Sequence, residues 1–428
     1  MKKLLIEISL IIISIFSSIF WIEFSFDKKM QVDSYQYLQI ADQIDNFDWR
    51  NVDINTTIYT PGYSIFILIF RQFIGLNGII YIQVLISALG FYFVYKLLSF
   101  FVKQQLAWLT TAILVFDPQI INYQTVILSD TLGWFVLTIN LWIHCQLIKK
   151  FSLRKLILSI VYGVLLMLTR SIFFYLPIFL FGIQFFISRR RVYLVAVIVT
   201  LFLIIGYQAQ NYRRYSFWGV SQVSQINLLG KFVEYGYLDQ KYSSPIPPEL
   251  KRIQLGYQQN FQEKSPYTIL KNTYNDNTSR EIAMNGLAKT NAFLMKTHLI
   301  DYLKKVIIQT KTNFTINRIY HGSLNFESYP KIKSFINAFF INLNHWKFIF
   351  FIISIFTWLY LFTQKRRPYY YFLGIMIFVI VYILLILTAI NYGDYARIRL
   401  SVEWLLNSMV ILPIIYIVEK GILWLKKH

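Results

Sequence analysis

Charged residues are scarce in this 428-residue chain, and cysteine is almost missing. Only 15% of the residues are charged, whereas a soluble domain carries about a quarter. So little charge, combined with long apolar runs along the whole chain, argues against a soluble globular protein. The single cysteine, Cys145, lies inside an apolar run, which excludes intrachain disulfides and cysteine-based metal centres.

Common catalytic and nucleotide-binding signatures are also missing. The sequence has no Walker-type glycine loop, no dinucleotide fingerprint, no His-x-x-x-His pair and no Gly-x-Ser-x-Gly elbow. The five histidines are scattered along the chain. The sequence therefore offers no support for P-loop, dinucleotide-dependent, zincin or serine-hydrolase chemistry.

Apolar and aromatic residues are abundant instead, at 56% and 18% of the chain. Runs of about 20 apolar residues, the length that crosses roughly 30 Å of hydrocarbon, recur with Trp and Tyr near many of their ends. The predicted fold class is an all-α polytopic membrane protein with about ten transmembrane helices and additional interfacial helices. The runs lie at 4–21, 77–101, 106–123, 131–148, 155–170, 171–188, 191–209, 346–363, 369–390 and 402–425.

The N-terminus is similar to a secretory signal peptide, with two lysines before an apolar stretch from Leu4 to Trp21. This stretch is long for a signal peptide, and no small-x-small cleavage site follows before Glu23. We therefore predict a retained first membrane helix, with cleavage as the alternative.

The net charge of +21 gathers in short clusters beside the apolar runs, as topology signals do, so we predict no nucleic-acid binding. The apolar segment 62–74 is short and contains Arg71, so we expect it in the interface or only partly inserted. Every compact basic cluster then falls on the cytoplasmic side. We predict a multi-pass plasma-membrane protein with both termini in the cytoplasm.

This topology divides the chain into three parts. We predict an N-terminal transmembrane module at 1–209 with a first external loop at 24–61, an external region at 210–345, and C-terminal transmembrane helices at 346–428. Residues 33–44 of the first loop have the spacing of a short amphipathic helix able to lie on the membrane surface.

Five charged residues fall at external membrane ends: Asp33, Asp130, Arg170, Arg397 and Arg399. A carboxylate there can take a proton from an attacking hydroxyl. Arginines can hold an anionic phosphate and keep their own charge. The alternatives are structural: each aspartate can be a helix N-cap, and Arg170 can be a turn residue between two helices.

Six short segments together resemble the GT-C superfamily of membrane glycosyltransferases, in its bacterial branch of aminoarabinose transferases and protein O-mannosyltransferase relatives. They appear in the order and at the topological positions of that family. The segments are Asp33-Ser34-Tyr35-Gln36-Tyr37, Tyr59-Thr60-Pro61-Gly62-Tyr63-Ser64, Leu128-Ser129-Asp130-Thr131-Leu132, Leu168-Thr169-Arg170, Asn211 to Leu228 and Asp394 to Glu403.

The resemblance implies roles for these residues. Asp33 would be the principal catalytic carboxylate, as base or as ligand of a divalent metal, and Asp130 the second acidic residue. Arg170, Arg397 and Arg399 would bind the donor phosphate. No cofactor is implied with certainty, and any divalent metal would use Asp33 and Asp130. The residues expected to support the cavity are Tyr59, Pro61, Gly62, Tyr63 and Asp394.

The resemblance also implies a reaction. A sugar would pass from a polyprenyl-phosphate donor to a hydroxyl on a lipid, glycan or protein acceptor at the outer face, with inversion. One rival is a lipid-linked glycan polymerase or ligase. Another is a flippase, which needs polar groups deep in its helices near the bilayer midplane.

Overall fold

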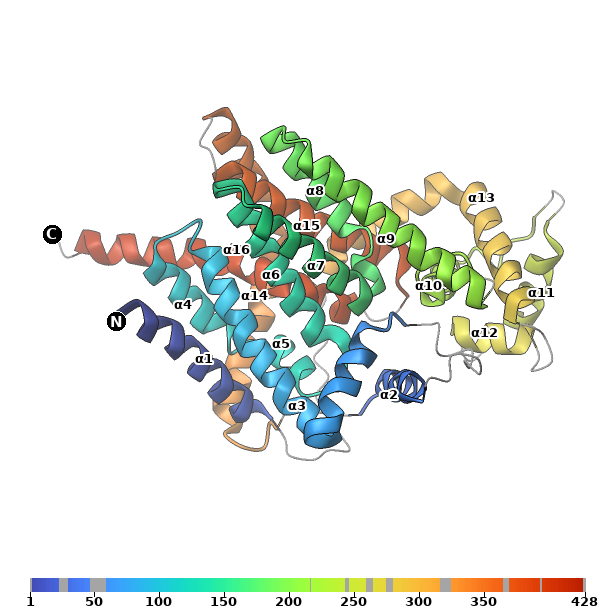
Figure 1. Cartoon of the computed structure of the whole chain (residues 1–428), viewed down its shortest axis with the longest axis horizontal. Helices are drawn as coiled ribbons and strands as arrows, with labels where there is room; N and C mark the ends of the chain where they lie inside the picture. Colours follow the sequence, from blue (N-terminus) through green and yellow to red (C-terminus); the bar gives the residue numbers. More distant parts are fainter. Residues whose placement is uncertain are drawn as a thin grey trace.

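The structure is a computed structural model (Figure 1). It describes residues 2–22, 30–46, 59–215, 217–242, 246–258, 265–274, 280–315, 325–364, 369–392 and 395–425. Every secondary-structure element given for these residues is helical. The first half contains α1 (Lys2–Trp21), α2 (Val32–Asp45), α3 (Gly62–Leu98), α4 (Gln104–Leu114), α5 (Pro118–Gln124), α6 (Ser129–Lys149), α7 (Leu153–Thr169), a 3₁₀ turn (Ser171–Phe173), α8 (Leu176–Ser188) and α9 (Val192–Tyr215).

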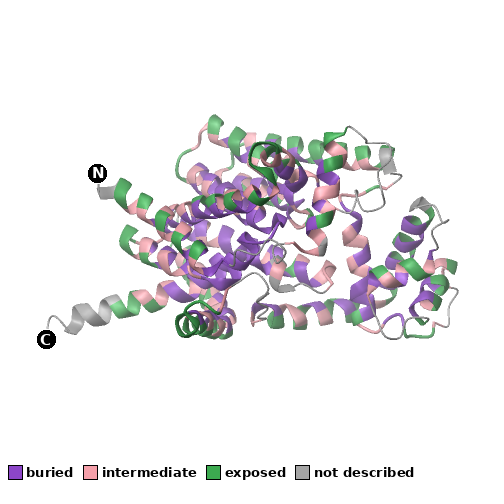
Figure 2. Cartoon of the chain, turned by 90° about the horizontal axis from the view of Figure 1, so that it is seen from below, coloured by how far each residue is buried: buried purple, intermediate pink, exposed green. Residues whose placement is uncertain are grey.

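The second half contains the helices of the predicted external region, here called the external helices, and the last three long helices. They are α10 (Gln222–Glu234), α11 (Pro248–Gln258), α12 (Pro266–Thr273), α13 (Arg280–Thr315), α14 (Pro330–Thr363), α15 (Tyr369–Ile390) and α16 (Tyr395–Leu425). Helices α10 to α13 form a unit at one end of the molecule (Figure 1). The start of α1 and the end of α16 lie at the opposite end (Figures 1 and 2).

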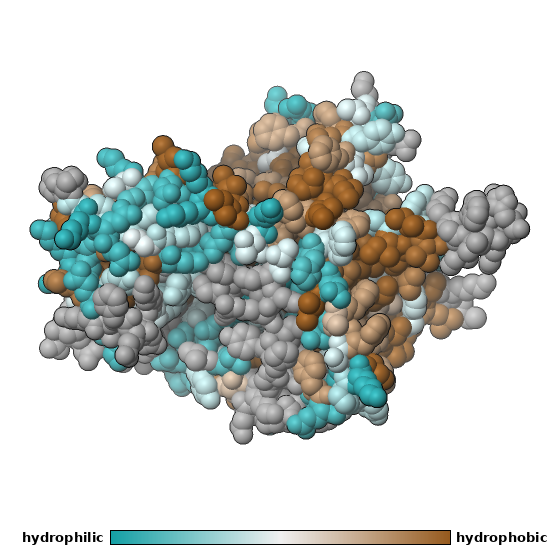
Figure 3. Space-filling view, turned by 180° about the vertical axis from the view of Figure 1, so that it is seen from behind, coloured by the Kyte–Doolittle hydropathy of each residue, from teal (hydrophilic) through white to brown (hydrophobic). Residues whose placement is uncertain are grey.

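Eight segments of the described residues are long and apolar enough to span a membrane. They lie in α1, α3, α6, the 3₁₀ turn with α8, α9, α14, α15 and α16. Hydrophobic surface gathers over the long helices, whereas the α10–α13 end is largely hydrophilic (Figure 3). The prediction of a polytopic all-α membrane protein is confirmed.

Two predicted spans are shorter than expected. The segment 106–123 is divided between α4 and α5, because Asp117 caps α5 by accepting from the Gln119 N–H at 2.9 Å and Pro118 occupies the first helical position. The segment 155–170 is α7, whose 17 residues reach about 25 Å. Helix α7 still packs along α6 in the interior.

The segment 62–74 is separated from the spanning helix that follows it. Gly75 has φ 69° and ψ 177°, a backbone conformation that interrupts α3 and that only glycine adopts without strain. The two halves of α3 run in different directions (Figure 1). This break agrees with the prediction that 62–74 is not part of the membrane span at 77–101.

The external helices have a hydrophobic core of their own, which includes Leu229, Phe232, Leu287 and Leu294. Helix α13 joins this unit to the membrane helices, because it packs on α10 and α11 and also on α14 and α15. The predicted boundary at 345 falls inside α14, which runs unbroken from Pro330. The apolar run 346–363 corresponds only to the second half of that helix.

Candidate active site

Asp33 lies in the first turn of α2, and its carboxylate faces two partners. Its Oδ1 accepts a hydrogen bond from the Tyr59 hydroxyl at 2.9 Å, and its Oδ2 accepts from Nη1 of Arg397. The N-cap of α2 is Gln31, which forms a capping box with Ser34. The alternative that Asp33 is an N-cap is therefore wrong: its side chain is turned away from the backbone of its own helix.

Asp130 lies in the first turn of α6 and is fully buried. The N-cap position belongs to Leu128, so the N-cap alternative fails here as well. Oδ1 of Asp130 accepts from Nη1 of Arg170, and Oδ2 accepts from Nε of Arg397 at 2.9 Å. A buried carboxylate with two guanidinium partners keeps its negative charge compensated.

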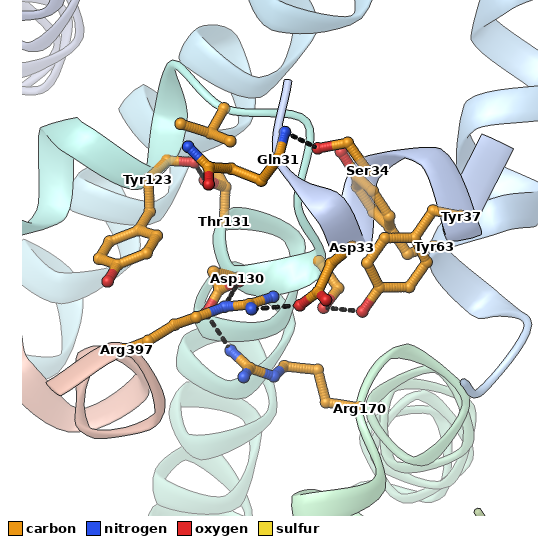
Figure 4. A network of polar contacts seen from close by, with 12 residues as sticks. Gln31, Asp33, Ser34, Tyr37, Tyr63, Tyr123, Asp130, Thr131, Arg170 and Arg397 are labelled. Atoms are coloured by element: carbon orange, nitrogen blue, oxygen red, sulfur yellow. Dashed lines mark hydrogen bonds and ion pairs between the residues drawn. The ribbon is translucent and has the colours of Figure 1, made fainter. Parts of the chain in front are cut away.

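Arg397 lies between the two aspartates and bonds to both (Figure 4). It comes from the first turn of α16, whereas Asp33 and Asp130 come from α2 and α6. The structure thus joins the predicted first external loop, the fourth predicted span and the predicted last external turn at one point. We call Asp33, Asp130, Arg170 and Arg397 the carboxylate–arginine cluster.

Arg170 ends α7 and precedes the 3₁₀ turn, so it is both a turn residue and an ion-pair partner of Asp130. Gly133 makes room for it on α6. A Cβ at Gly133 would lie 3.0 Å from Cδ of Arg170, a contact tighter than side chains normally make. The absence of a side chain at this position lets Arg170 cross the face of α6.

Gly62 and Pro61 fix the start of α3 beside Arg170. Pro61 is the N-cap of α3. A Cβ at Gly62 would lie only 2.6 Å from the carbonyl oxygen of Leu168, so only glycine allows this approach to the end of α7. The Pro-Gly pair therefore has a packing role next to the cluster.

The rings of Tyr37, Tyr59 and Tyr63 pack together beside Asp33. The ring centroid of Tyr37 lies 4.9 Å from those of both Tyr59 and Tyr63. The Tyr37 hydroxyl is 2.8 Å from that of Ser129, which directly precedes Asp130. Tyr63 donates to Gln83, which in turn donates to two carbonyls of the segment before α6. These contacts tie α2, α3 and α6 together around the two carboxylates.

No protein-family model matches the sequence, and no curated protein matches it at a significant level. Among solved structures, the chain is similar to the archaeal oligosaccharyltransferase AglB from Archaeoglobus fulgidus in complex with an inhibitory peptide and a dolichol-phosphate, with a TM-score of 0.51 and 15% identity. The alignment covers 96% of this chain and 50% of the archaeal chain, so the chain spans half the length of that enzyme. The chain has a GT-C-like fold. The fold that the sequence resemblance to the GT-C superfamily implies is therefore confirmed.

Within this GT-C-like fold, the two carboxylates differ in access to solvent. The Asp33 side chain is 25% exposed, whereas that of Asp130 is 0% exposed. Burial raises the pKa of Asp33, but the charge and hydrogen bond of Arg397 and the Tyr59 hydroxyl outweigh it, so its pKa lies below the usual value. Asp33 is therefore a partly exposed, ionised carboxylate, as a proton acceptor must be.

Arg399 does not join this arrangement. Asp394 lies outside the described residues. The Arg399 side chain is fully buried and donates to the carbonyls of Asn313 and Phe314, both at 2.8 Å, and to Glu403 at 2.9 Å. Its charge is thus compensated by Glu403 and by the last turn of α13.

A second group of polar residues, which sequence reasoning missed, surrounds Arg399. Lys347 of α14 donates to Glu403, and Asn407 donates to Asp117 at 2.5 Å. We call Asp117, Lys347, Arg399, Glu403 and Asn407 the buried network; each is at most 1% exposed. Its only local sequence signal is the four-residue spacing of Arg399 and Glu403, which places an ion pair inside an apolar helix.

Proposed function

We propose that this protein is a membrane glycosyltransferase that moves a sugar from a polyprenyl-phosphate donor to an acceptor hydroxyl at the outer face. The observation that carries the proposal is the carboxylate–arginine cluster, in which an accessible Asp33 lies beside guanidinium groups at one end of a GT-C-like helix bundle. Similarity to an oligosaccharyltransferase supports glycosyl transfer as the reaction class.

In the proposed reaction, Asp33 takes the proton of the acceptor hydroxyl as its oxygen attacks the anomeric carbon. The bond between that carbon and the phosphate oxygen breaks, and polyprenyl phosphate leaves. Attack opposite the leaving group inverts the anomeric configuration. Arg397 and Arg170 stabilise the negative charge that grows on the departing phosphate. Asp130 holds both arginines in place through its two oxygens.

The acceptor would bind between the cluster and the external helices. Tyr267 of α12 is partly exposed, and its pKa is raised to about 12 by burial and by the charge of Asp33. We assign the ring of Tyr267 to the acceptor side of the site, as the residue that the external helices contribute. The acceptor class is a lipid, a glycan or a protein.

We also propose that both termini face the cytoplasm, in accordance with the positive-inside rule.

The test is release of free polyprenyl phosphate from a panel of polyprenyl-phosphate sugars by the protein purified in nanodiscs. Asp33→Asn should reduce release by about 10²- to 10⁴-fold, the usual contribution of a general base. The matched control is Asp42→Asn, which makes the same chemical change on the same helix at a side chain that is 56% exposed. This control should retain the wild-type rate.

Equal release by wild type and Asp33→Asn would remove Asp33 from the mechanism. No release from any donor by folded wild-type protein would instead favour the polymerase, ligase or flippase alternatives. Donors linked through a diphosphate are then the next substrates, because a polymerase or ligase uses them.

A further inference from the structure

The positive charge between the carboxylates of Asp33 and Asp130 comes from the guanidinium group of Arg397. Arg397 donates through Nε to Asp130 and through Nη1 to Asp33. The two remaining carboxylate oxygens accept from Tyr59 and Arg170. All four oxygens that would be offered to a metal thus already have a donor from the protein. Figure 4 shows the two arginines beside the two carboxylates.

A divalent metal does not fit this set of ligands. Magnesium takes six oxygen ligands and calcium six to eight, and both require ligands free of competing cations. Among the described residues, no group of three or more His, Cys, Asp or Glu side chains is placed to hold a metal. A metal between Asp33 and Asp130 would have to displace Arg397 and would lie beside a second guanidinium, that of Arg170.

We infer that Arg397 occupies the place of a divalent metal in this site. At rest it bonds to both carboxylates, whose two negative charges it balances together with Arg170, and during turnover it binds the phosphate of the donor. The phosphate step rests on the proposed function, whereas the exclusion of metal rests on the ligand set alone.

The geometry indicates how one side chain can do both. Arginine has five N–H donors and does not lose its charge, and the two bonds to the carboxylates begin at Nε and Nη1. Asp130 is fully buried and accepts from both arginines, so it is the fixed partner. Asp33 is the exposed partner, so an entering phosphate competes with it for Nη1. Release from Arg397 then frees Asp33 to accept the acceptor's proton.

The first test measures Mn²⁺ binding by electron paramagnetic resonance on the chelator-treated full chain in detergent. Wild type should show no Mn²⁺ binding that depends on Asp33. The double variant Arg170→Gln with Arg397→Gln should gain such binding, and the further change Asp33→Asn should remove it. One Mn²⁺ bound by wild type and lost in Asp33→Asn would overturn the inference. Failure of the double variant to bind Mn²⁺ would also overturn it, because a reason other than the two guanidinium groups would then exclude the metal. Size-exclusion profiles check that each variant is folded.

The second test measures polyprenyl-phosphate release with and without a chelator. The expected change is less than about twofold, because an enzyme that relies on a metal as Lewis acid loses far more. A loss that Mn²⁺ restores would overturn the inference. The binding measurement needs no donor, so it stays informative if the proposed function fails: that failure would appear only as the absence of Asp33-dependent release.

Discussion

The carboxylate–arginine cluster and the buried network both depend on the first turns of α16. Each contains two acidic and two basic side chains, and each joins helices that are distant in sequence. They differ in access to solvent. Asp33 is 25% exposed and Arg397 is 14% exposed, whereas Lys347 and Glu403 are at most 1% exposed.

This difference in exposure suits the carboxylate–arginine cluster to substrate binding and the buried network to holding helices together. A network this deeply buried cannot exchange ligands with a substrate, so we expect its charges to fix helices. A cluster with one accessible carboxylate can exchange partners. Variants in the two groups should therefore change different measured quantities: turnover in the cluster and free energy of unfolding in the network.

The largest effect on stability is expected from Glu403→Gln. The change leaves Lys347 and Arg399 without their anionic partner in the interior, and breaking a buried pair in this way costs about 3–5 kcal/mol of the free energy of unfolding. The double variant Lys347→Met with Glu403→Gln should recover part of that loss, because the remaining charges of Asp117 and Arg399 balance. Thermal denaturation in detergent measures both. Wild-type stability of Glu403→Gln would show that the network does not anchor α16.

A smaller effect on both quantities is expected from Gly62→Ala. Its Cβ would meet the Leu168 carbonyl at 2.6 Å, so the start of α3 must shift away from Arg170. Overpacking of this kind costs about 1–3 kcal/mol of stability. A displacement of about 1 Å beside the reacting groups can reduce turnover by up to about 10²-fold. Gly206→Ala is the matched control, because nothing lies within 4 Å of its added Cβ. Equal behaviour of the two variants would contradict the close contact.

An effect on turnover without a loss of stability is expected from Tyr59→Phe, which removes one hydrogen bond to Asp33. A hydrogen bond to a charged group contributes about 1.5–3 kcal/mol, so turnover should fall roughly 10- to 150-fold at most. The pKa of Asp33 is lowered in the native protein, so turnover should fall only as the pH drops below the ordinary value of 3.8. Without the Tyr59 hydroxyl this pKa rises, and the acid limb of the pH profile should move to higher pH. An unchanged acid limb would mean that Asp33 is not the titrating group.

The hydrophobic runs predicted most of the fold, because membrane-spanning length and apolar composition are local properties of a sequence. The run 131–148 corresponds to α6, and the run 369–390 coincides with α15. Asp117 and Pro118 form a helix-start signal in the sequence, but the apolar residues on both sides of the pair led to the prediction of one continuous span.

The candidate site was predictable only in part. The structure brings Asp33, Asp130, Arg170 and Arg397 within hydrogen-bonding distance, and the sequence resemblance had singled out all four. Arg399 lies on the other side of α16 from Arg397, because residues two positions apart in an α-helix are separated by about 200° around its axis. Lys347 and Asp117 could not be foreseen as its neighbours, since their contact depends on how α5, α14 and α16 pack.

The opposite placement of Arg397 and Arg399 prevents α16 from turning. Arg399 is bonded to α13 and to Glu403, so rotation of α16 about its axis would break those bonds before it could move Arg397 away from Asp130. If the Asp33–Arg397 contact opens in the proposed reaction, we expect the movement on the Asp33 side. Helix α16 is then the fixed side of the cluster, and α2 is the side that adjusts.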